Sequence, residues 1–155
     1  MEEKVEYRFT PDDTPLPLSL RPGGGVPYHQ FEEPSSSILQ TFPAPTSIHS
    51  ITDRGHTITF SCDQEITALC PLTGQPDFYS VVITYQPHEL CIESKSAKLY
   101  LGSYRSVKGF IEEIALRMLT DWVSACSPKF VKVTLTMAPR GGIAIEVVRE
   151  YGREL

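Results

Sequence analysis

Two helical segments follow one another between two pairs of alternating strands, and this order restricts the fold more than any other feature of the sequence. The clearest element covers residues 109–126, where apolar side chains recur at helical spacing: Ile111, Ile114, Met118 and Trp122. A Ser-Pro pair ends this helix after Cys126. Strands on both sides of adjacent helices predict an α+β fold with an antiparallel sheet rather than a doubly wound parallel one.

The other expected elements are shorter. Residues 56–62 alternate, with Ile58 and Phe60 on one face, which is typical of a strand with one buried side. Good helix formers at 95–105 predict a short helix that breaks near Gly102. Patterns rich in β-branched and aromatic residues predict three more strands, at 78–87, 130–138 and 142–151. The predicted order is therefore ββααββ.

The N-terminal part differs in composition from the rest. Residues 1–46 hold eight of the 13 prolines together with the stretches PGGG and PSSS. We expect an extended arm here, with no helix, and a single folded domain at 47–155. Aromatic side chains in the arm can pack on the domain or on a neighbouring subunit: Tyr7, Phe9, Tyr28, Phe31 and Phe42.

Charge and cysteine content exclude several classes of protein. The net charge of −5 argues against a broad basic surface for duplex nucleic acid. No apolar run reaches the length of a membrane span, and the acidic start lacks a secretory signal, so we expect a cytoplasmic protein without a membrane partner. The cysteines form no CxxC pair and no histidine has zinc-finger spacing, so no metal is expected: Cys62, Cys70, Cys91 and Cys126.

The stretch CPLTGQPDF begins with a cysteine and holds an aspartate seven residues later. Pro71 favours an extended Cys70, and Gly74 permits a tight bend. We therefore expect two strand ends that face each other across a short loop, with the Cys70 thiol close to the Asp77 carboxyl group. The structural alternative is a buried cysteine and an ordinary turn aspartate.

Two further stretches carry cations suited to phosphate. Lys95 and Lys98 are three residues apart, so they share a face at the start of a helix, where anions are favoured. Arg140 stands beside two glycines in PRGG, where a phosphate can approach closely. The alternatives are a solvated basic face with a serine cap and a Gly-rich hairpin. Glu112 and Glu113 open the long helix, where capping is the structural explanation.

Taken together and in this order, four stretches closely resemble one family: CPLTGQPD, ESKSAKLYL, the Phe-x-Glu of Phe110–Glu112, and PRGGIAI. The family is the NADPH-dependent 7-cyano-7-deazaguanine reductases, the nitrile reductases of queuosine biosynthesis, in their short single-module form. The resemblance covers roughly Phe42–Gly152, and ESKSxK distinguishes these reductases from their relatives. It implies the tunnelling fold, shared with GTP cyclohydrolase, in which ββααββ units assemble into an oligomeric barrel with active sites between subunits.

The resemblance also implies a role for each motif residue. Cys70 would attack the nitrile carbon to form a covalent thioimide, and Asp77 would supply protons. The substrate site would consist of Ile92, Glu93, Ser94, Phe110, Ile111 and Glu112. The NADPH phosphates would meet Lys95, Lys98 and Arg140. Two NADPH would be consumed per nitrile, with the small-molecule nitrile as substrate, no metal and no direct contact with nucleic acid.

One position departs from the family pattern. The residue before Glu112 is usually histidine and here is Ile111, so another histidine would have to replace it: His29, His49, His56 or His88. Two other functions remain open. One is an amidinotransferase-like enzyme that adds ammonia to a nitrile on transfer RNA, and the other is a non-catalytic oligomer that binds a deazapurine or pterin. The lysine motif and the negative charge favour the reductase.

Overall fold

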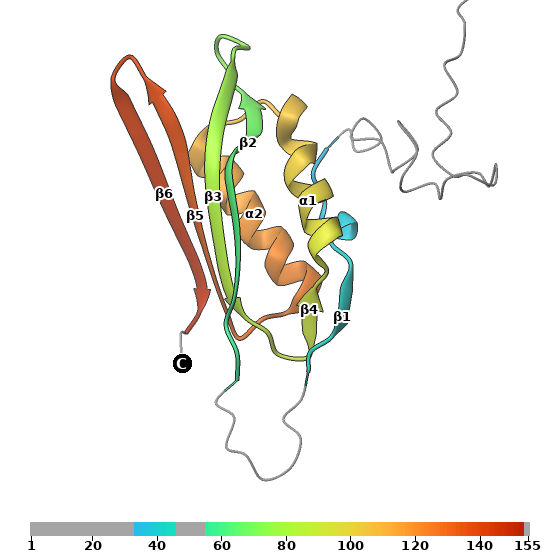
Figure 1. The fold of residues 1–155 in the computed structure, drawn as a ribbon. Helices are drawn as coiled ribbons and strands as arrows, with labels where there is room; N and C mark the ends of the chain where they lie inside the picture. The colour runs from blue at the N-terminus through green and yellow to red at the C-terminus, as the bar shows by residue number, and fades with distance from the viewer. Residues whose placement is uncertain (1–32, 46–54, 154–155) are drawn as a thin grey trace, which may run out of the picture. The chain divides into compact units, whose positions relative to one another are not determined.

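Figure 1 shows the computed structural model of the chain, which describes residues 33–45 and 55–153. The strands are β1 (Thr41–Pro43), β2 (Ile58–Leu69), β3 (Pro76–Gln86), β4 (Leu90–Ile92), β5 (Phe130–Arg140) and β6 (Ile143–Gly152). The helices are α1 (Ser94–Gly102) and α2 (Ile111–Cys126), with 3-10 turns η3 (Ser36–Ile38) and η4 (Ser103–Ser106). The predicted α+β class with antiparallel sheets is confirmed.

The main sheet has the strand order β2-β3-β5-β6, and every neighbouring pair is antiparallel. Both helices cover one face of it (Figure 1). Burial alternates along β3, where Tyr79, Val81, Ile83 and Tyr85 are buried and the residues between them are more exposed. This alternation results from the two-residue period of a strand with one face against the core.

The core is centred on α2. The four apolar residues predicted to share its inner face are all buried: Ile111, Ile114, Met118 and Trp122. The Trp122 ring packs edge-on against Phe60, Tyr85 and Tyr100, with ring centroids 5.6, 6.3 and 6.1 Å away. Edge-to-face pairs of this kind stabilise a core by about 0.5–1.5 kcal/mol beyond the area they bury. None of the described helices is long and apolar enough to cross a membrane.

The two outer strands of the sheet are long. β2 has 12 residues and β6 has 10. Within the described part of the chain β6 pairs on one side only, and the second side of β2 pairs only at Leu69, by a bridge to Lys108. β2 extends past the predicted 56–62 strand because a bulge between Cys62 and Ile66 interrupts the alternation without ending the pairing with β3. An unpaired strand edge presents N–H and C=O groups that can pair with another chain.

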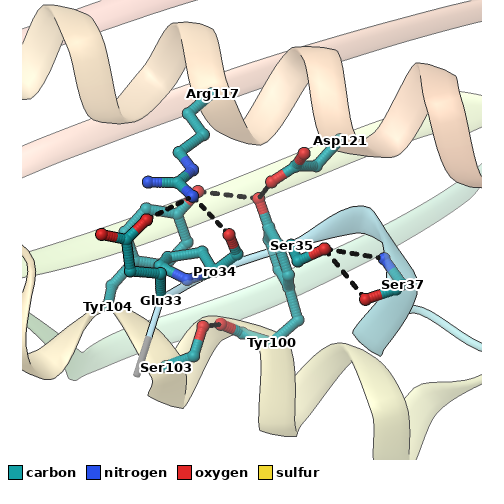
Figure 2. A network of polar contacts seen from close by, with 9 residues as sticks. All are labelled: Glu33, Pro34, Ser35, Ser37, Tyr100, Ser103, Tyr104, Arg117 and Asp121. Atoms are coloured by element: carbon teal, nitrogen blue, oxygen red, sulfur yellow. Dashed lines mark hydrogen bonds and ion pairs between the residues drawn. The ribbon is translucent and has the colours of Figure 1, made fainter. Parts of the chain in front are cut away.

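The described residues 33–45 pack on the domain. Strand β1 pairs with β4, and Arg117 of α2 donates hydrogen bonds to the Pro34 carbonyl and to Glu33 (Figure 2). The last part of the predicted arm is thus bound to α2 and β4. Its first part, residues 1–32, lies outside the described residues, and the division at residue 46 stays a prediction.

A chain of hydroxyl groups links α1 and η4 to α2. Tyr100 Oη donates to Asp121 Oδ2 at 2.7 Å and lies 2.7 Å from Tyr104 Oη (Figure 2). Because the only Tyr100 proton is used on Asp121, Tyr104 is the donor to Tyr100. Burial raises the pKa of both phenols, so both keep their protons. The end of α1 is therefore fixed to α2 by polar contacts as well as apolar ones.

Candidate active site

The loop between β2 and β3 brings a thiol and a carboxyl group to the same end of the sheet. Cys70 directly follows β2, and Asp77 is the second residue of β3. The Cys70 N–H donates to the Gln75 carbonyl and the Gly74 N–H donates to the Cys70 carbonyl, both at 2.8 Å. Gly74 adopts φ +71°, a conformation that favours glycine, which is why the loop can close so tightly.

The Cys70 thiol has the environment of a nucleophile. Hydrogen bonds from the Thr73 hydroxyl, from the backbone of Thr73 and Leu72, and from Arg140 lower its pKa from 9.0 to about 7. At neutral pH roughly half of it is thiolate, the reactive form. Burial instead raises the pKa of the other three thiols, those of Cys62, Cys91 and Cys126. The pKa of Cys126 is raised to about 12.

Asp77 is 5% exposed and accepts a hydrogen bond from Arg140, with Nη1 2.5 Å from Oδ1. Arg140 Nη2 donates to Gln75 Oε1 at 3.1 Å. Strand β5 brings the guanidinium here because its register with β3, in which Met137 pairs with Tyr79, carries Arg140 to the level of the first residues of β3. Arg140 was predicted to meet a cofactor phosphate, and this stays a prediction; in this structure its side chain contacts the Asp77 carboxylate.

The start of α2 lies beside the same loop. The Leu69 N–H donates to the Val107 carbonyl at 2.8 Å, and the Gly109 N–H donates to the Leu69 carbonyl at 3.3 Å. Phe110 and Glu112 follow, and both are exposed. The Phe110 N–H donates to the Glu113 carboxylate at 3.1 Å, so Glu113 rather than Glu112 caps the helix.

Exposed apolar side chains occur at this end of the sheet. Leu72 is 82% exposed in the Cys70 loop, and Ile143 is 67% exposed where β6 begins, opposite Arg140. Phe110, which is 51% exposed, precedes α2 beside the same loop.

Ile111, between the exposed Phe110 and Glu112, is buried. Its side chain is 5% exposed and belongs to the core, so within one chain it does not line a surface. His56 precedes β2, and its Nε2 lies 3.8 Å from Cys91 Sγ. Cys70 follows the last residue of β2, so His56 is at the opposite end of this strand. His88 is exposed between β3 and β4, and the remaining two histidines lie outside the described residues: His29 and His49.

A second group of predicted site residues stands where α1 begins. Glu93 Oε1 accepts from the Lys95 N–H at 2.7 Å and Oε2 from the Ser96 N–H at 2.8 Å. These backbone hydrogen bonds, that of Lys95 first, lower the pKa of Glu93. The cap is therefore Glu93 and not a serine, and the N–H groups expected to attract a phosphate are already used. Lys95 and Lys98 are exposed.

The two groups lie at opposite ends of α1 (Figure 1). Glu93 precedes its first residue, and η4 leads from its last residue to the segment beside β2. Nine helical residues at about 1.5 Å each separate the two ends by roughly 13 Å. Within one chain the predicted site residues therefore form two separate groups. The first group is Cys70, Asp77, Arg140, Phe110 and Glu112, and the second is Ile92, Glu93, Ser94 and Lys95.

Two residues of the loop were not predicted as part of the site. Thr73 donates to the Cys70 thiol, and the Gln75 side chain accepts from Arg140. Both are polar residues inside CPLTGQPD, where a tight turn brings every side chain close to the thiol, so the loop itself was the available signal. Within the described ranges no cluster of three His, Cys, Asp or Glu side chains has metal-binding geometry.

Comparison with known proteins matches this chain to one family. The family model described as QueF-like protein matches residues 76–155, more than half of the chain. The chain belongs to the QueF-like family. A family member named NADPH-dependent 7-cyano-7-deazaguanine reductase, from Streptococcus thermophilus, is 42% identical over 136 residues, which cover 88% of this chain and 78% of the relative.

A second relative and one solved structure agree with this family assignment. A protein of the same name from Bacillus pumilus is 40% identical over 116 residues, which cover 75% of this chain and 67% of the relative. Among solved structures, the apo form of the archaeosine synthase QueF-Like superposes with a TM-score of 0.59 at 26% identity. That match covers 64% of this chain and 96% of the archaeosine synthase.

Proposed function

We propose that this chain is an NADPH-dependent nitrile reductase that converts 7-cyano-7-deazaguanine into 7-aminomethyl-7-deazaguanine in queuosine biosynthesis. The observation that carries the proposal is the Cys70 thiol, whose pKa is lowered to about 7, next to the Asp77 carboxylate. The identity of 42% to a relative named for this reaction supports the choice of substrate.

The first step uses the thiolate. Cys70 Sγ forms a bond to the nitrile carbon, one π pair of the C≡N bond moves to nitrogen, and the nitrogen takes a proton. The product is a covalent thioimide, which accepts hydride more readily than the nitrile does. Asp77, the carboxylate paired with Arg140 at this end of the sheet, is the proposed group that takes the proton from the Cys70 thiol and passes it to the nitrogen.

The reduction then needs two hydrides, and NADPH supplies them when bound. The first hydride and a proton would reach the C=N bond, the C–S bond would break, and Cys70 would leave as thiolate from a protonated imine. A second hydride would give the primary amine, so two NADPH and two protons would be consumed per nitrile, one of these protons in thioimide formation. Lys95 and Lys98, exposed on α1, fit a role in holding the phosphates of the cofactor.

We further propose the tunnelling fold, in which copies assemble into a barrel with sites between subunits. Two observations support this. Glu93 precedes α1, whereas the segment that follows α1 and η4 lies beside the Cys70 loop, and both outer strands, β2 and β6, offer long edges. The second copy would then bring Glu93 to the Cys70 of the first.

Mixing inactive variants tests this shared site. Cys70→Ala and Glu93→Gln chains, unfolded and refolded together in equal amounts, would recover about a quarter of the wild-type sites, because half of the chains supply each intact group. Each variant refolded alone is the control. Absence of recovery in the mixture, with assembly intact by light scattering, would place both groups in one chain.

An amidinotransferase-like function is the second candidate, favoured by the superposition on the archaeosine synthase. It would use Cys70 and Asp77 in the same way but add ammonia instead of hydride. A third candidate, a non-catalytic deazapurine- or pterin-binding oligomer, would bind without reaction. The ESKSAK stretch, with Lys95 and Lys98 exposed, favours the reductase because its cations suit a dinucleotide phosphate.

One assay separates the three candidates. NADPH absorbance is followed with and without 7-cyano-7-deazaguanine, and the product is identified by mass. The reductase oxidises two NADPH for each aminomethyl product, and Cys70→Ala oxidises none. An amidine formed from ammonia without NADPH oxidation would support the amidinotransferase, and binding without any product would support the non-catalytic oligomer.

A further inference from the structure

We propose that Gln75 and Arg140 are positioning residues for the reacting pair: Gln75 fixes the guanidinium of Arg140 so that it bridges the Asp77 carboxylate and the Cys70 thiol. This inference rests on the proposed function for its consequence in catalysis. It assigns Arg140 to the reacting groups rather than to a cofactor phosphate, and it adds Gln75, which lies in the CPLTGQPD stretch but was not predicted as a site residue.

The geometry of the guanidinium supports the first part. Arg140 Nη1 lies 2.5 Å from Asp77 Oδ1, and Nη2 lies 3.1 Å from Gln75 Oε1. A guanidinium is planar, so contacts from two different nitrogens set the orientation of the whole group. Gln75 therefore supplies a second contact that fixes the orientation of the guanidinium, which the ion pair with Asp77 alone would not do.

Gln75 is itself held by the loop that carries the thiol. Its carbonyl accepts from the Cys70 N–H at 2.8 Å, and its N–H donates to Thr73 Oγ1 at 3.3 Å. The same residue thus binds the backbone of Cys70 on one side and the side chain of Arg140 on the other. A change at Gln75 would therefore alter the position of Arg140 relative to the thiol.

The bridge has a chemical consequence for both partners. A positive charge next to Cys70 favours the thiolate, and Arg140 is one of the groups that lower the pKa of this thiol, after Thr73 and Leu72. The same charge compensates the carboxylate of Asp77, which is 5% exposed. Withdrawing Arg140 to a phosphate would leave this nearly buried carboxylate without its cation, which is costly.

The test uses iodoacetamide as a probe of the thiol, which requires no substrate. Alkylation of Cys70 is measured against pH in the full chain, with the modified cysteine identified by peptide mass. In Arg140→Gln we expect the rate at pH 7, taken as a fraction of its own high-pH plateau, to fall about two- to threefold. Gln75→Leu should shift the curve in the same direction and by no more than Arg140→Gln does.

Lys132→Gln is the matched control, because Lys132 is a cation on the same strand whose partner is Glu150, at 3.2 Å. Its alkylation curve should coincide with that of the wild type. Arg140→Lys keeps the charge but not the planar pair of guanidinium nitrogens, so its curve should fall between those of the wild type and Arg140→Gln. Thermal unfolding of each variant is measured to check that the fold is retained.

A second readout separates positioning from cofactor binding. In Arg140→Gln, thioimide formation without NADPH should slow while the KM for NADPH stays unchanged. An unchanged alkylation curve with a raised KM would overturn the proposal and return Arg140 to the phosphate. If the wild type fails to reduce the nitrile, the proposed function falls, whereas the alkylation curves still decide whether Gln75 and Arg140 act on the thiol.

Discussion

Thr73→Val is the most direct test of how the loop activates Cys70. The Thr73 hydroxyl is the first of the contacts that lower the pKa of the thiol from 9.0 to about 7. Valine keeps the β-branched shape of threonine but has no O–H to donate to the sulfur. The substitution therefore removes the hydrogen bond from the hydroxyl to the thiolate, together with the acceptor of the Gln75 N–H, and keeps the backbone N–H groups of Leu72 and Thr73.

The size of the effect follows from the shift itself. The contacts together lower the pKa by about two units from 9.0. Loss of the largest single contact should return about 0.5 to 1 unit, to a pKa of roughly 7.5 to 8. At pH 7 the thiolate fraction then falls from roughly half to between about a tenth and a quarter. A more basic thiolate is intrinsically a better nucleophile, so the high-pH plateau should not fall.

Iodoacetamide alkylation between pH 5 and about 10 measures this curve, with Cys70 identified by peptide mass. Thr59→Val is the matched control, since Thr59 is also exposed and hydrogen-bonded, to Thr84 at 3.1 Å, far from the loop. The midpoint should move up in Thr73→Val and stay in Thr59→Val. A Thr73→Val midpoint equal to that of the wild type would show that the hydroxyl does not stabilise the thiolate and that our account of the loop is wrong.

Three further outcomes are expected. Asp77→Asn should lower turnover by about 10²–10⁴-fold, measured by NADPH oxidation, while the fold is retained; turnover near that of the wild type would remove Asp77 from the mechanism. Lys95→Ala and Lys98→Ala should raise the KM for NADPH and leave thioimide formation unchanged, whereas a slower adduct would assign them to the substrate. Tyr100→Phe should lower the free energy of unfolding by about 1–3 kcal/mol in urea titrations, and Tyr104→Phe by less, because only Tyr100 bonds two partners; equal losses would contradict the hydroxyl chain.

Long elements with a strong period were predictable from the sequence. The inner face of α2 and the break of α1 near Gly102 both agree with the periodic pattern. β1 and β4 were not predicted, because strands of three residues are too short to show alternation. The C-terminal half of β2 was missed because its bulge interrupts the period at Cys62–Ile66.

The candidate site divides in the same way between local and non-local features. The proximity of Cys70 and Asp77 was predictable because a short loop joins their strands. The contact of Arg140 with Asp77 was not, since it depends on the pairing register of β3 with β5, two strands separated by both helices in sequence. The cap at Glu93 was also missed, because a serine is the commoner capping residue and the sequence offered two.

The cap at Glu93 has an entropic consequence for recognition. A free glutamate side chain populates many rotamers, and immobilising such a side chain in a complex costs about 0.5–1.5 kcal/mol. Here Lys95 N–H and Ser96 N–H already hold both carboxylate oxygens when α1 forms. That ordering cost belongs to folding, so a ligand that donates a hydrogen bond to Glu93 meets an acceptor whose direction is already set.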